Sequence, residues 1–437
     1  MDYKETLEYL YRQLPMFSRV GAAAYKPGLD TSLALDAAFD HPHRRFRSIH
    51  VGGTNGKGST SHTLAAMLQA QGYKTGLYTS PHLVDFRERM RINGKMIPEQ
   101  KVVEFIRDFL ASGYEGRPSF FELTMMMAFK WFADQKVDYA VIEVGMGGRL
   151  DSTNIITPEA CVITNISPDH MQFLGGTLPA IAAEKAGIIK SGIPVVIGES
   201  DGEVREVFAR RASEAGAPIV YADQRKLLRN AEPCSEGGFD CEAEGLGKFR
   251  FELGGDYQKA NINTALAAVE VLRGAGIEIS DESMRKGFAE VSELTGLAGR
   301  WMKMCDAPLT ICDTGHNIAG VGYNMNQLRN IMSKRSGSKL HIVLGFVADK
   351  DIDHILRIFP RDAEYYVSNA AIPRALPAGE LAVRMTDAGL PVDVPTRVFA
   401  SVKDAYDAAA GMAAAADVVF IGGSTFVVAD YLASLKS

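Results

Sequence analysis

Cysteine is scarce in this sequence of 437 residues, and long runs of apolar residues are missing. The five cysteines are odd in number and include no CxxC pair, which argues against a disulfide framework and against structural zinc. No apolar run approaches the roughly 18 residues of a membrane span, and residues 1–14 are charged and amphipathic. We therefore expect a protein of the reducing cytoplasm with no membrane partner.

Strong charge of one sign is also absent. The 47 basic and 53 acidic residues give a formal net charge of −6 without a long like-charge run, so nothing indicates binding to nucleic acid. There is no low-complexity tail and no repeat of fixed period. With 46% hydrophobic residues, a chain of this length can bury more than one core. We expect two or three structural units and small-molecule partners.

The most informative stretch that is present is VGGTNGKGST, residues 51–60. Its glycines let backbone N–H groups converge on phosphate oxygens, Lys57 adds a fixed positive charge, and the hydroxyl of Ser59 or Thr60 can reach Mg²⁺ or phosphate. A strand is expected before the stretch and a helix after it, with the N-terminal dipole facing the anion. Gly58 separates the lysine from the hydroxyl residue, a departure from the strict P-loop pattern. Glycine-rich turns are common in α/β proteins, but the flanking elements favour a nucleotide phosphate site.

Apolar, β-branched runs alternate with segments of helical period along most of the chain, as in sheets whose parallel strands are buried on both faces. Between about 221 and 255 the pattern becomes short, polar and glycine-containing, which predicts a small antiparallel excursion. The predicted fold class is α/β. We expect a mostly parallel, P-loop-type ATP-binding domain over residues 1–296 and a Rossmann-like α/β domain over residues 297–437. Strands expected in the second domain cover residues 309–312, 339–344, 364–367, 397–400 and 418–421.

Polar residues follow three further strands of the first predicted domain. Ser80, Glu143 and His170 each stand in or just before a turn that follows a strand-like run. Ligands of open parallel sheets bind at the carboxyl ends of the strands, so these side chains are expected to converge near the phosphates. A hydroxyl, a carboxylate and an imidazole suit a Mg²⁺ site. Taken singly, Ser80 is better interpreted as a turn residue, Glu143 as a surface residue and His170 as a loop residue. Their joint placement reverses this and favours the metal site.

Separated motifs run through nearly the whole chain, among them GTNGKGS, TSPHLVDFRERMRING, FFELT, EVGMGGRLDSTN, EKAGIIKSG and DTGHN. In this order they resemble the folylpolyglutamate synthases and dihydrofolate synthases of the Mur ligase superfamily. Two turns depart from the family pattern. Ala298 stands where relatives usually have proline, and Gly315 and Ile318 flank the His-Asn pair in place of alanine and proline. These changes affect the expected backbone geometry more than the function.

The resemblance implies a site, residue by residue. Lys185 would be the lysine that is carbamylated in this family, because a carbamate offers the metal negatively charged oxygens where an ammonium would repel it. Without the resemblance, Lys185 reads as an ordinary helix lysine. The phosphates would be held by Thr54, Asn55, Gly56, Lys57, Gly58 and Ser59, two Mg²⁺ ions by Ser80, Glu143, His170 and carbamylated Lys185, and the rest of ATP by Asn261, Arg300, Asp313 and His316.

The implied reaction is ATP-driven amide formation. A carboxylate of dihydropteroate or of a folate attacks the γ-phosphate of ATP, and the amine of L-glutamate then attacks the acyl phosphate. Lys57, Glu143, His170 and Lys185 would be the catalytic residues of a monomeric enzyme. The family's pterin-substrate region is matched by Ser119, Phe120, Phe121, Arg149, Leu150 and Asp151, which serve equally well as core or capping residues.

Two alternatives remain beside this bifunctional ligase, and a third is set aside. The enzyme could extend folates only, as a monofunctional folylpolyglutamate synthase. A cell-wall amino-acid ligase of the same superfamily would need another α/β domain before the phosphate loop, and the roughly 50 residues there are too few. A nucleotide-dependent switch would fit the loop alone, although the sequence has no Asn-Lys-x-Asp guanine-reading motif. Glutamate-dependent ADP release distinguishes a ligase from a switch.

Overall fold

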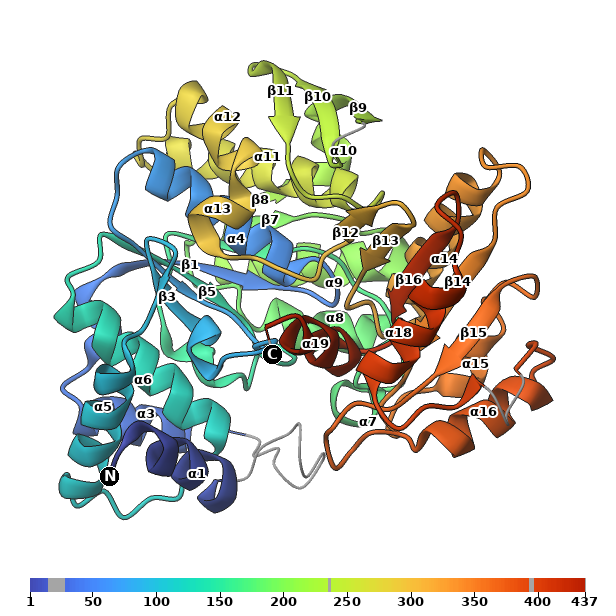
Figure 1. The fold of residues 1–437 in the computed structure, drawn as a ribbon. Helices are drawn as coiled ribbons and strands as arrows, with labels where there is room; N and C mark the ends of the chain where they lie inside the picture. The colour runs from blue at the N-terminus through green and yellow to red at the C-terminus, as the bar shows by residue number, and fades with distance from the viewer. Residues whose placement is uncertain (15–27, 235–236, 393–396, 437) are drawn as a thin grey trace. The chain divides into compact units, whose positions relative to one another are not determined.

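The computed structural model describes residues 1–14, 28–234, 237–392 and 397–436, which form two compact units (Figure 1). Among these residues, unit 1 is built from Met1–Cys234, Gly238–Glu252 and Tyr257–Leu297. Unit 2 contains Leu253–Asp256 and Ala298–Ser437. The chain therefore enters unit 2 briefly, returns to unit 1, and then completes unit 2.

Unit 1 is organised around an eight-stranded sheet in the order β4-β3-β2-β5-β1-β6-β7-β8. Six strands run parallel, whereas β3 pairs antiparallel with β2 and β4 antiparallel with β3. This confirms the predicted mostly parallel sheet. The strands are β1 (Arg47–Gly52), β2 (Thr75–Tyr78), β3 (Met90–Ile92), β4 (Lys95–Met96), β5 (Tyr139–Glu143), β6 (Ala160–Ile163), β7 (Val195–Ile197) and β8 (Ile219–Tyr221).

Helices bury their apolar sides on this sheet in two large clusters. One cluster joins α5 and α6 to β2 and β5, and the other joins α8 and α9 to β6 and β7. The described helices of unit 1 are α1 (Tyr3–Gln13), α3 (Asp30–Ala38), η2 (Pro42–Arg45), α4 (Lys57–Ala70), η3 (Phe86–Arg89), α5 (Glu99–Ala111), α6 (Phe120–Asp134), η4 (Ser152–Ile155), α7 (Met171–Leu174), α8 (Leu178–Ala186), α9 (Gly202–Ala215), α10 (Ala222–Arg225), α11 (Gln258–Gly274), α12 (Asp281–Ala289) and α13 (Val291–Thr295).

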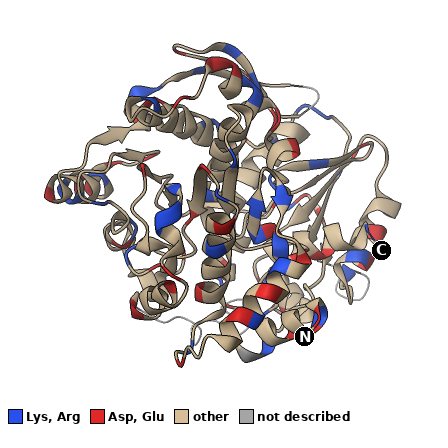
Figure 2. Ribbon diagram, turned by 90° about the vertical axis from the view of Figure 1, so that its left-hand side faces the viewer, with Lys and Arg blue, Asp and Glu red and all other residues tan. Residues whose placement is uncertain are grey.

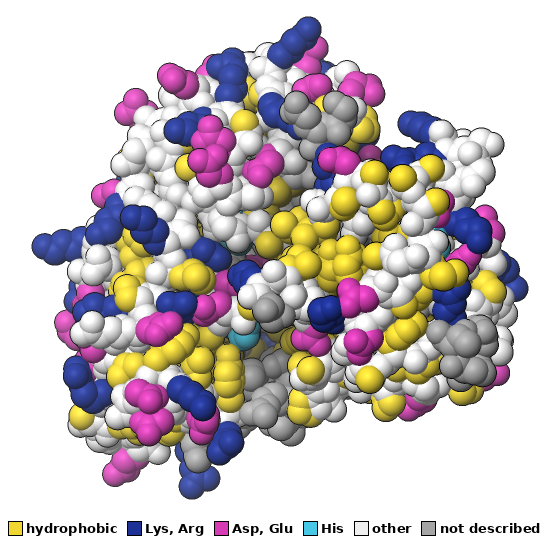
Figure 3. Space-filling view, in the orientation of Figure 1, with side chains coloured by type: hydrophobic (Ala, Val, Ile, Leu, Met, Phe, Trp, Pro, Cys, Tyr) yellow, Lys and Arg dark blue, Asp and Glu magenta, His cyan; other side chains and the backbone are white. Residues whose placement is uncertain are grey.

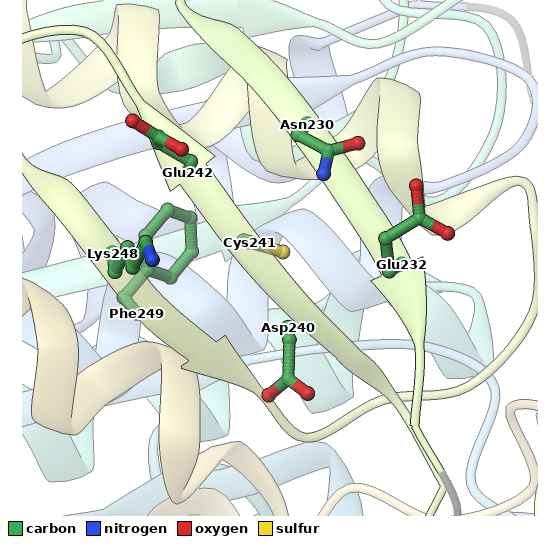
Figure 4. A pocket seen from close by; sticks show the side chains of 7 residues that line it. All are labelled: Asn230, Glu232, Asp240, Cys241, Glu242, Lys248 and Phe249. Carbon is green, nitrogen blue, oxygen red and sulfur yellow. The ribbon is translucent and has the colours of Figure 1, made fainter.

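The predicted antiparallel excursion is a three-stranded sheet of β9 (Leu228–Pro233), β10 (Phe239–Ala243) and β11 (Gly247–Phe251). Residues of β10 alternate between buried and exposed, as expected for a sheet with one covered face. A shallow pocket on it is lined by charged side chains of both signs, including Glu232, Asp240 and Lys248 (Figure 4).

Unit 2 contains a five-stranded sheet in the order β12-β13-β16-β14-β15, with an apolar core on each face. Only the edge strand β12 is antiparallel to its neighbour among the described strands. The strand expected at 397–400 is reduced to a single bridge between Val398 and Val367. The elements are β12 (Met302–Asp306), β13 (Leu309–Cys312), α14 (Ile318–Met332), β14 (Leu340–Leu344), α15 (Ile352–Leu356), β15 (Glu364–Val367), α16 (Ala378–Asp387), α18 (Val402–Met412), β16 (Val418–Gly422) and α19 (Thr425–Ser434).

Charged residues of both signs are interspersed along the helices (Figure 2). The space-filling view shows the same mixture, with apolar side chains between them (Figure 3). Among the residues that the structure describes, none of the helices combines the length and the apolarity needed to cross a bilayer.

Helices α4 and α12 approach so closely that only glycine fits at one position. A Cβ atom on Gly287 of α12 would lie 2.7 Å from both the backbone nitrogen and the Cα atom of Met67 in α4. Backbone atoms cannot give way as a flexible side chain does, so a larger residue must push the two helices apart.

We expect Gly287→Ala to destabilise unit 1 by about 1–3 kcal/mol, because overpacking forces a backbone shift. Gly274→Ala is the matched control, since nothing lies within 4 Å of a Cβ atom at that helical position. That change should be neutral or stabilising by up to about 1 kcal/mol. Thermal unfolding of both variants checks this. Equal melting temperatures for the two variants would contradict the close contact.

Candidate active site

The turn between β1 and α4 requires glycine at two positions. Gly53 has a φ of 134°, and a Cβ atom there would lie 1.9 Å from Thr164 Oγ1. Gly56, the residue that precedes α4, has a φ of 83°, and its Cβ atom would lie 2.2 Å from Asn261 Oδ1. The loop therefore fits closely between the end of β6 and helix α11. We call residues 53–56 the phosphate loop.

The segment after β6 holds this loop in place. Thr54 N donates to the Asn165 carbonyl at 2.9 Å, and Ser167 N donates to Thr54 Oγ1 at 3.1 Å. Asn55 N donates to Asn165 Oδ1 at 3.0 Å. Thr54 and Asn55 thus brace the loop with their side chains and backbone. The first turn of α4, from Lys57 onward, directs its N–H groups toward the N-terminal end of the helix, where an anion is stabilised.

Two lysines hydrogen-bond to carbonyl oxygens of the phosphate loop. Lys57 Nζ donates to the Thr54 carbonyl at 3.1 Å, and Lys185 Nζ donates to the Gly53 carbonyl at 2.8 Å. Lys185 is only 4% exposed. Burial, with a smaller contribution from the Lys57 charge, lowers the pKa of Lys185 to about 7. Near neutral pH a substantial fraction of Lys185 is therefore an uncharged amine, which is the reactive form of a lysine.

Glu143 ends the strand next to β1, and its carboxylate is buried with 4% exposure. The register pairs Val51 with Glu143 on one side and with Val162 on the other, so β1, β5 and β6 end at the same edge. Glu143 Oε2 accepts a hydrogen bond of 2.9 Å from the backbone N–H of Ser80, which follows β2. The predicted convergence of strand ends is present for Ser80 and Glu143.

His170 stands immediately before α7, in the segment that follows β6. Its φ is 49°, a left-handed conformation that is uncommon outside glycine and asparagine. Its Nε2 atom lies 3.9 Å from Asp169 Oδ2. The buried Glu143 carboxylate and the neighbouring Ser80 offer oxygen donors that fit Mg²⁺, with Glu143 as the charged ligand. His170 follows β6, which is separated from β5 by β1 in the sheet.

Asp151 folds the glycine-rich turn that follows Glu143. Its Oδ2 atom accepts a hydrogen bond of 2.9 Å from Met146 N, and its Oδ1 atom accepts one of 3.0 Å from Thr153 N. Burial raises the pKa of Asp151 above its usual value. Arg149 forms an ion pair with the Glu184 carboxylate at 2.8 Å. Leu150, which stands between Arg149 and Asp151 in the sequence, is partly exposed. The capping role anticipated for Asp151 is therefore present.

Ser119 and Phe120 also have clear structural roles. Ser119 forms a capping box with Glu122 at the start of α6, and Phe120 stacks on Tyr11 within the core. Phe121 is different, because its ring reaches the turn after β5. A Cβ atom on Gly145 would lie 2.5 Å from that ring. Phe121 therefore links helix α6 to the turn that Asp151 folds.

Gln258, to which the sequence pattern assigned no role in the site, is fully buried at the start of α11. Its Nε2 atom donates to Ser59 Oγ at 3.1 Å, and its Oε1 atom accepts a hydrogen bond of 2.7 Å from Asn261 Nδ2. Gln258 and Asn261 lie three residues apart, so they share one face of the helix. That spacing was the available signal. Together they join α11 to the phosphate loop and to α4.

In unit 2, Asp313 follows β13 and braces two turns. Its Oδ2 atom accepts a hydrogen bond of 2.7 Å from Trp301 N, and its Oδ1 atom accepts bonds from Gly315 N at 2.7 Å and Asn324 Nδ2 at 2.8 Å. The first bond fixes the turn that carries Arg300. His316 Nδ1 lies 3.0 Å from the Thr314 carbonyl. The turn without the family's usual proline is thus held by a carboxylate.

Both units match known domain families. Residues 51–269 match the Mur ligase middle domain, and residues 299–425 match the Mur ligase, glutamate ligase domain. The chain is thus built from the two domains of a Mur-type ligase.

Proteins of similar sequence identify the family within the Mur-type ligases. A Mycobacterium tuberculosis dihydrofolate synthase/folylpolyglutamate synthase is 36% identical over 90% of this chain and 84% of its own length. The Bacillus subtilis protein of that name is 35% identical over 76% of this chain and 78% of its own length. A Lacticaseibacillus casei folylpolyglutamate synthase is 32% identical over 86% of this chain and 88% of its own length. The chain belongs to the dihydrofolate synthase/folylpolyglutamate synthase family of ATP-dependent Mur ligases.

Solved structures agree with this family in fold. Escherichia coli FolC in complex with DHPP and ADP covers 100% of this chain and 98% of its own, at 29% identity and a TM-score of 0.84. A bifunctional folylpolyglutamate synthase/dihydrofolate synthase with Mn, AMPPNP and L-glutamate bound covers the same shares, at 30% identity and a TM-score of 0.81.

We expect Gly53→Ala to lower nucleotide affinity and turnover by at least about tenfold, because the new Cβ atom collides with Thr164 and displaces the loop. Gly72→Ala is the control. It also has a positive φ, of 99°, but nothing lies within 4 Å of its Cβ atom. It should cost about 1 kcal/mol of stability and leave nucleotide binding unchanged. Titration with ADP checks both variants, and unchanged affinity in folded Gly53→Ala would contradict the tight fit.

Proposed function

We propose that this protein joins L-glutamate to dihydropteroate and to folates in two ATP-dependent reactions that pass through an acyl phosphate. The observation that carries the proposal is the phosphate loop, where Lys57 and Lys185 hydrogen-bond to adjacent carbonyls beside the buried Glu143. The positive charge of Lys57 and the N–H groups at the N-terminus of α4 favour a polyanion such as a triphosphate. Family membership supports a ligase and argues against a nucleotide-dependent switch.

In the proposed mechanism, the N-terminus of α4 and Lys57 bind the phosphates and stabilise the charge that develops during transfer. The substrate carboxylate displaces ADP from the γ-phosphate, and the glutamate amine then displaces phosphate from the acyl carbon. Ser80, Glu143 and His170 would hold Mg²⁺, with carbamylated Lys185 as a further ligand. When bound, Mg²⁺ neutralises phosphate charge and orients the triphosphate.

The remaining site residues are assigned to substrate and nucleotide. We place Thr54, Asn55, Gly58 and Ser59 at the phosphates through the loop and helix that they shape. Phe121 and the turn 149–151 are assigned to the pterin end of the substrate, with Ser119 and Phe120 supporting Phe121 from the core. Residues 1–296 would bind ATP and residues 297–437 would complete the ligase, acting as a cytoplasmic monomer. The rest of ATP would be bound by Asn261, Arg300, Asp313 and His316.

Coupled measurement of ADP release with ATP and L-glutamate tests the function. We expect turnover with dihydropteroate and with a reduced folate, each dependent on glutamate. Lys57→Ala should lower both rates by at least about a hundredfold without unfolding the protein. Lys74→Ala is the control, because that lysine bonds to Gln135 away from the loop. Turnover with the folate alone would restrict the protein to folylpolyglutamate synthesis, and no glutamate-dependent turnover would contradict the ligase.

Replacement of Lys185 tests the proposed carbamate. The neutral amine reacts with CO₂, so the modified fraction should increase with bicarbonate and as the pH rises through the pKa of about 7. Lys185→Ala should lose most activity and regain part of it with a small carboxylic acid in solution. Lys185→Arg should be equally inactive, because a guanidinium forms no carbamate.

Lys190→Ala is the matched control, since Lys190 is also partly buried and donates to a backbone carbonyl, that of Asn154, at 2.8 Å. Its activity should not respond to the added acid. A carbamate signal in carbon-13 NMR with labelled bicarbonate, lost in Lys185→Ala, gives a direct readout. Near-normal activity of Lys185→Arg would show that Lys185 acts only as a cation.

A further inference from the structure

A second group of metal-ligating side chains lies in unit 1, at the C-terminal end of α3. Asp36 belongs to this helix, while His41 and His43 flank Pro42 just beyond it. His41 Nδ1 lies 2.6 Å from Asp36 Oδ2, and His43 Nδ1 lies 2.7 Å from Asp36 Oδ1. The three ligand atoms lie within 4.8 Å of one another. Within the described part of the chain, this is the one group of three or more such side chains that meets this spacing.

The carboxylate at the centre of the cluster is almost inaccessible to solvent. Asp36 is 1% exposed, whereas the side chains of His43 and His41 are 12% and 39% exposed. Burial alone would raise the pKa of Asp36, but hydrogen bonds from His43 and His41 lower it below its usual value. Asp36 is therefore ionised, and the exposed edge of His41 gives an ion a path from solvent.

The backbone is held in an uncommon conformation to bring His41 onto Asp36. Asp40 and His41 have φ values of 59° and 48°, two successive left-handed residues of which neither is glycine. The backbone N–H of His41 also donates to the Asp36 carbonyl at 2.9 Å. Such conformations cost free energy and persist where surrounding interactions fix them, often at functional sites.

We propose that Asp36, His41 and His43 bind one divalent transition metal ion of the zinc class. The ligands are the two Nδ1 atoms and the Asp36 carboxylate, and water completes the coordination. Imidazole nitrogens select such ions over Mg²⁺, which prefers oxygen. Coordination uses the lone pair of Nδ1, so in the metal-bound form each neutral ring carries its single hydrogen on Nε2. In tetrahedral geometry the nitrogen and oxygen atoms separate by about half an ångström beyond their present distances.

The site is structural, because it joins the end of α3 to η2 and thereby to the start of β1. The scarcity of cysteine argues against a thiolate zinc site, whereas the ligands here are two histidines and a carboxylate. Helix α3 also reaches α6, where Ser32 Oγ donates to Glu122 Oε1 at 3.4 Å. Glu122 is the acidic residue of the α6 capping box. A metal at Asp36 would therefore stabilise the packing of α3 against α6 and the position of η2, which precedes β1. Its ligands are separate from Ser80, Glu143 and His170, which are assigned to Mg²⁺.

Binding of Co²⁺ and Zn²⁺ to the full chain tests the proposal. Protein stripped with a chelator is titrated in a large excess of Mg²⁺, with Co²⁺ followed by its d–d absorption and Zn²⁺ by calorimetry. We expect one equivalent to bind and to raise the melting temperature. His41→Gln and His43→Gln should each weaken binding at least about tenfold, since each removes one ligand. Both variants keep the buried Asp36, so we expect them to disturb folding less than Asp36→Asn would.

Two controls separate this site from other histidines and from the proposed catalytic metal. His354→Gln removes an exposed histidine that also hydrogen-bonds to an aspartate, Asp351, through Nδ1. It should leave binding unchanged, as should Glu143→Ala. Equal binding by the wild type and both cluster variants, or no binding in excess Mg²⁺, would overturn the proposal and leave the cluster as a buried ion-paired aspartate. Loss of binding only in Glu143→Ala would do the same.

Discussion

The candidate site of unit 1 depends on how two lysine side chains contact the backbone of the phosphate loop. Lys57 and Lys185 both donate to carbonyls of the phosphate loop, and Lys185 does so from a buried position. Two positive charges so close together in a poorly solvated site disfavour each other, which contributes to the lowered pKa of Lys185. Loss of the Lys185 proton relieves this repulsion and leaves Lys57 as the fixed positive charge of the loop. Hydrogen bonds from Thr54 to Asn165 and from Ser167 to Thr54 hold the loop backbone in place around that charge.

The parallel sheet makes this arrangement possible because it brings strand ends together without requiring sequence proximity. Val51 lies between Glu143 and Val162 in register, so residues about a hundred positions apart meet at one edge. Helices α4 and α11 then approach the loop from the side. Their approach depends on Gly56, where a side chain would collide with Asn261. The close approach of α11 to the phosphate loop therefore restricts position 56 to glycine.

Much of this was predictable from sequence, and the exceptions have physical causes. Apolar runs of β-branched residues predict buried strands well, and glycines before a lysine predict the loop. Residues 397–400 look like a strand, but only Val398 forms a bridge because pairing partners determine strand length. Gln258 was assigned no role in the site, because its three-residue spacing from Asn261 indicates a shared helix face but not the hydrogen bond to Ser59. Ser119 and Asp151 fit both a cap and a binding role, and only their hydrogen bonds reveal the cap.

The late position of α11 in the sequence has a consequence for synthesis on the ribosome. Its Gln258 hydrogen-bonds to Ser59, 199 positions earlier. A nascent chain that has already formed β1, α4 and β5 still lacks this support for its phosphate loop. Nucleotide therefore meets a finished loop only after α11 has emerged. Premature termination before α11 yields a protein with the loop sequence intact and the loop incomplete.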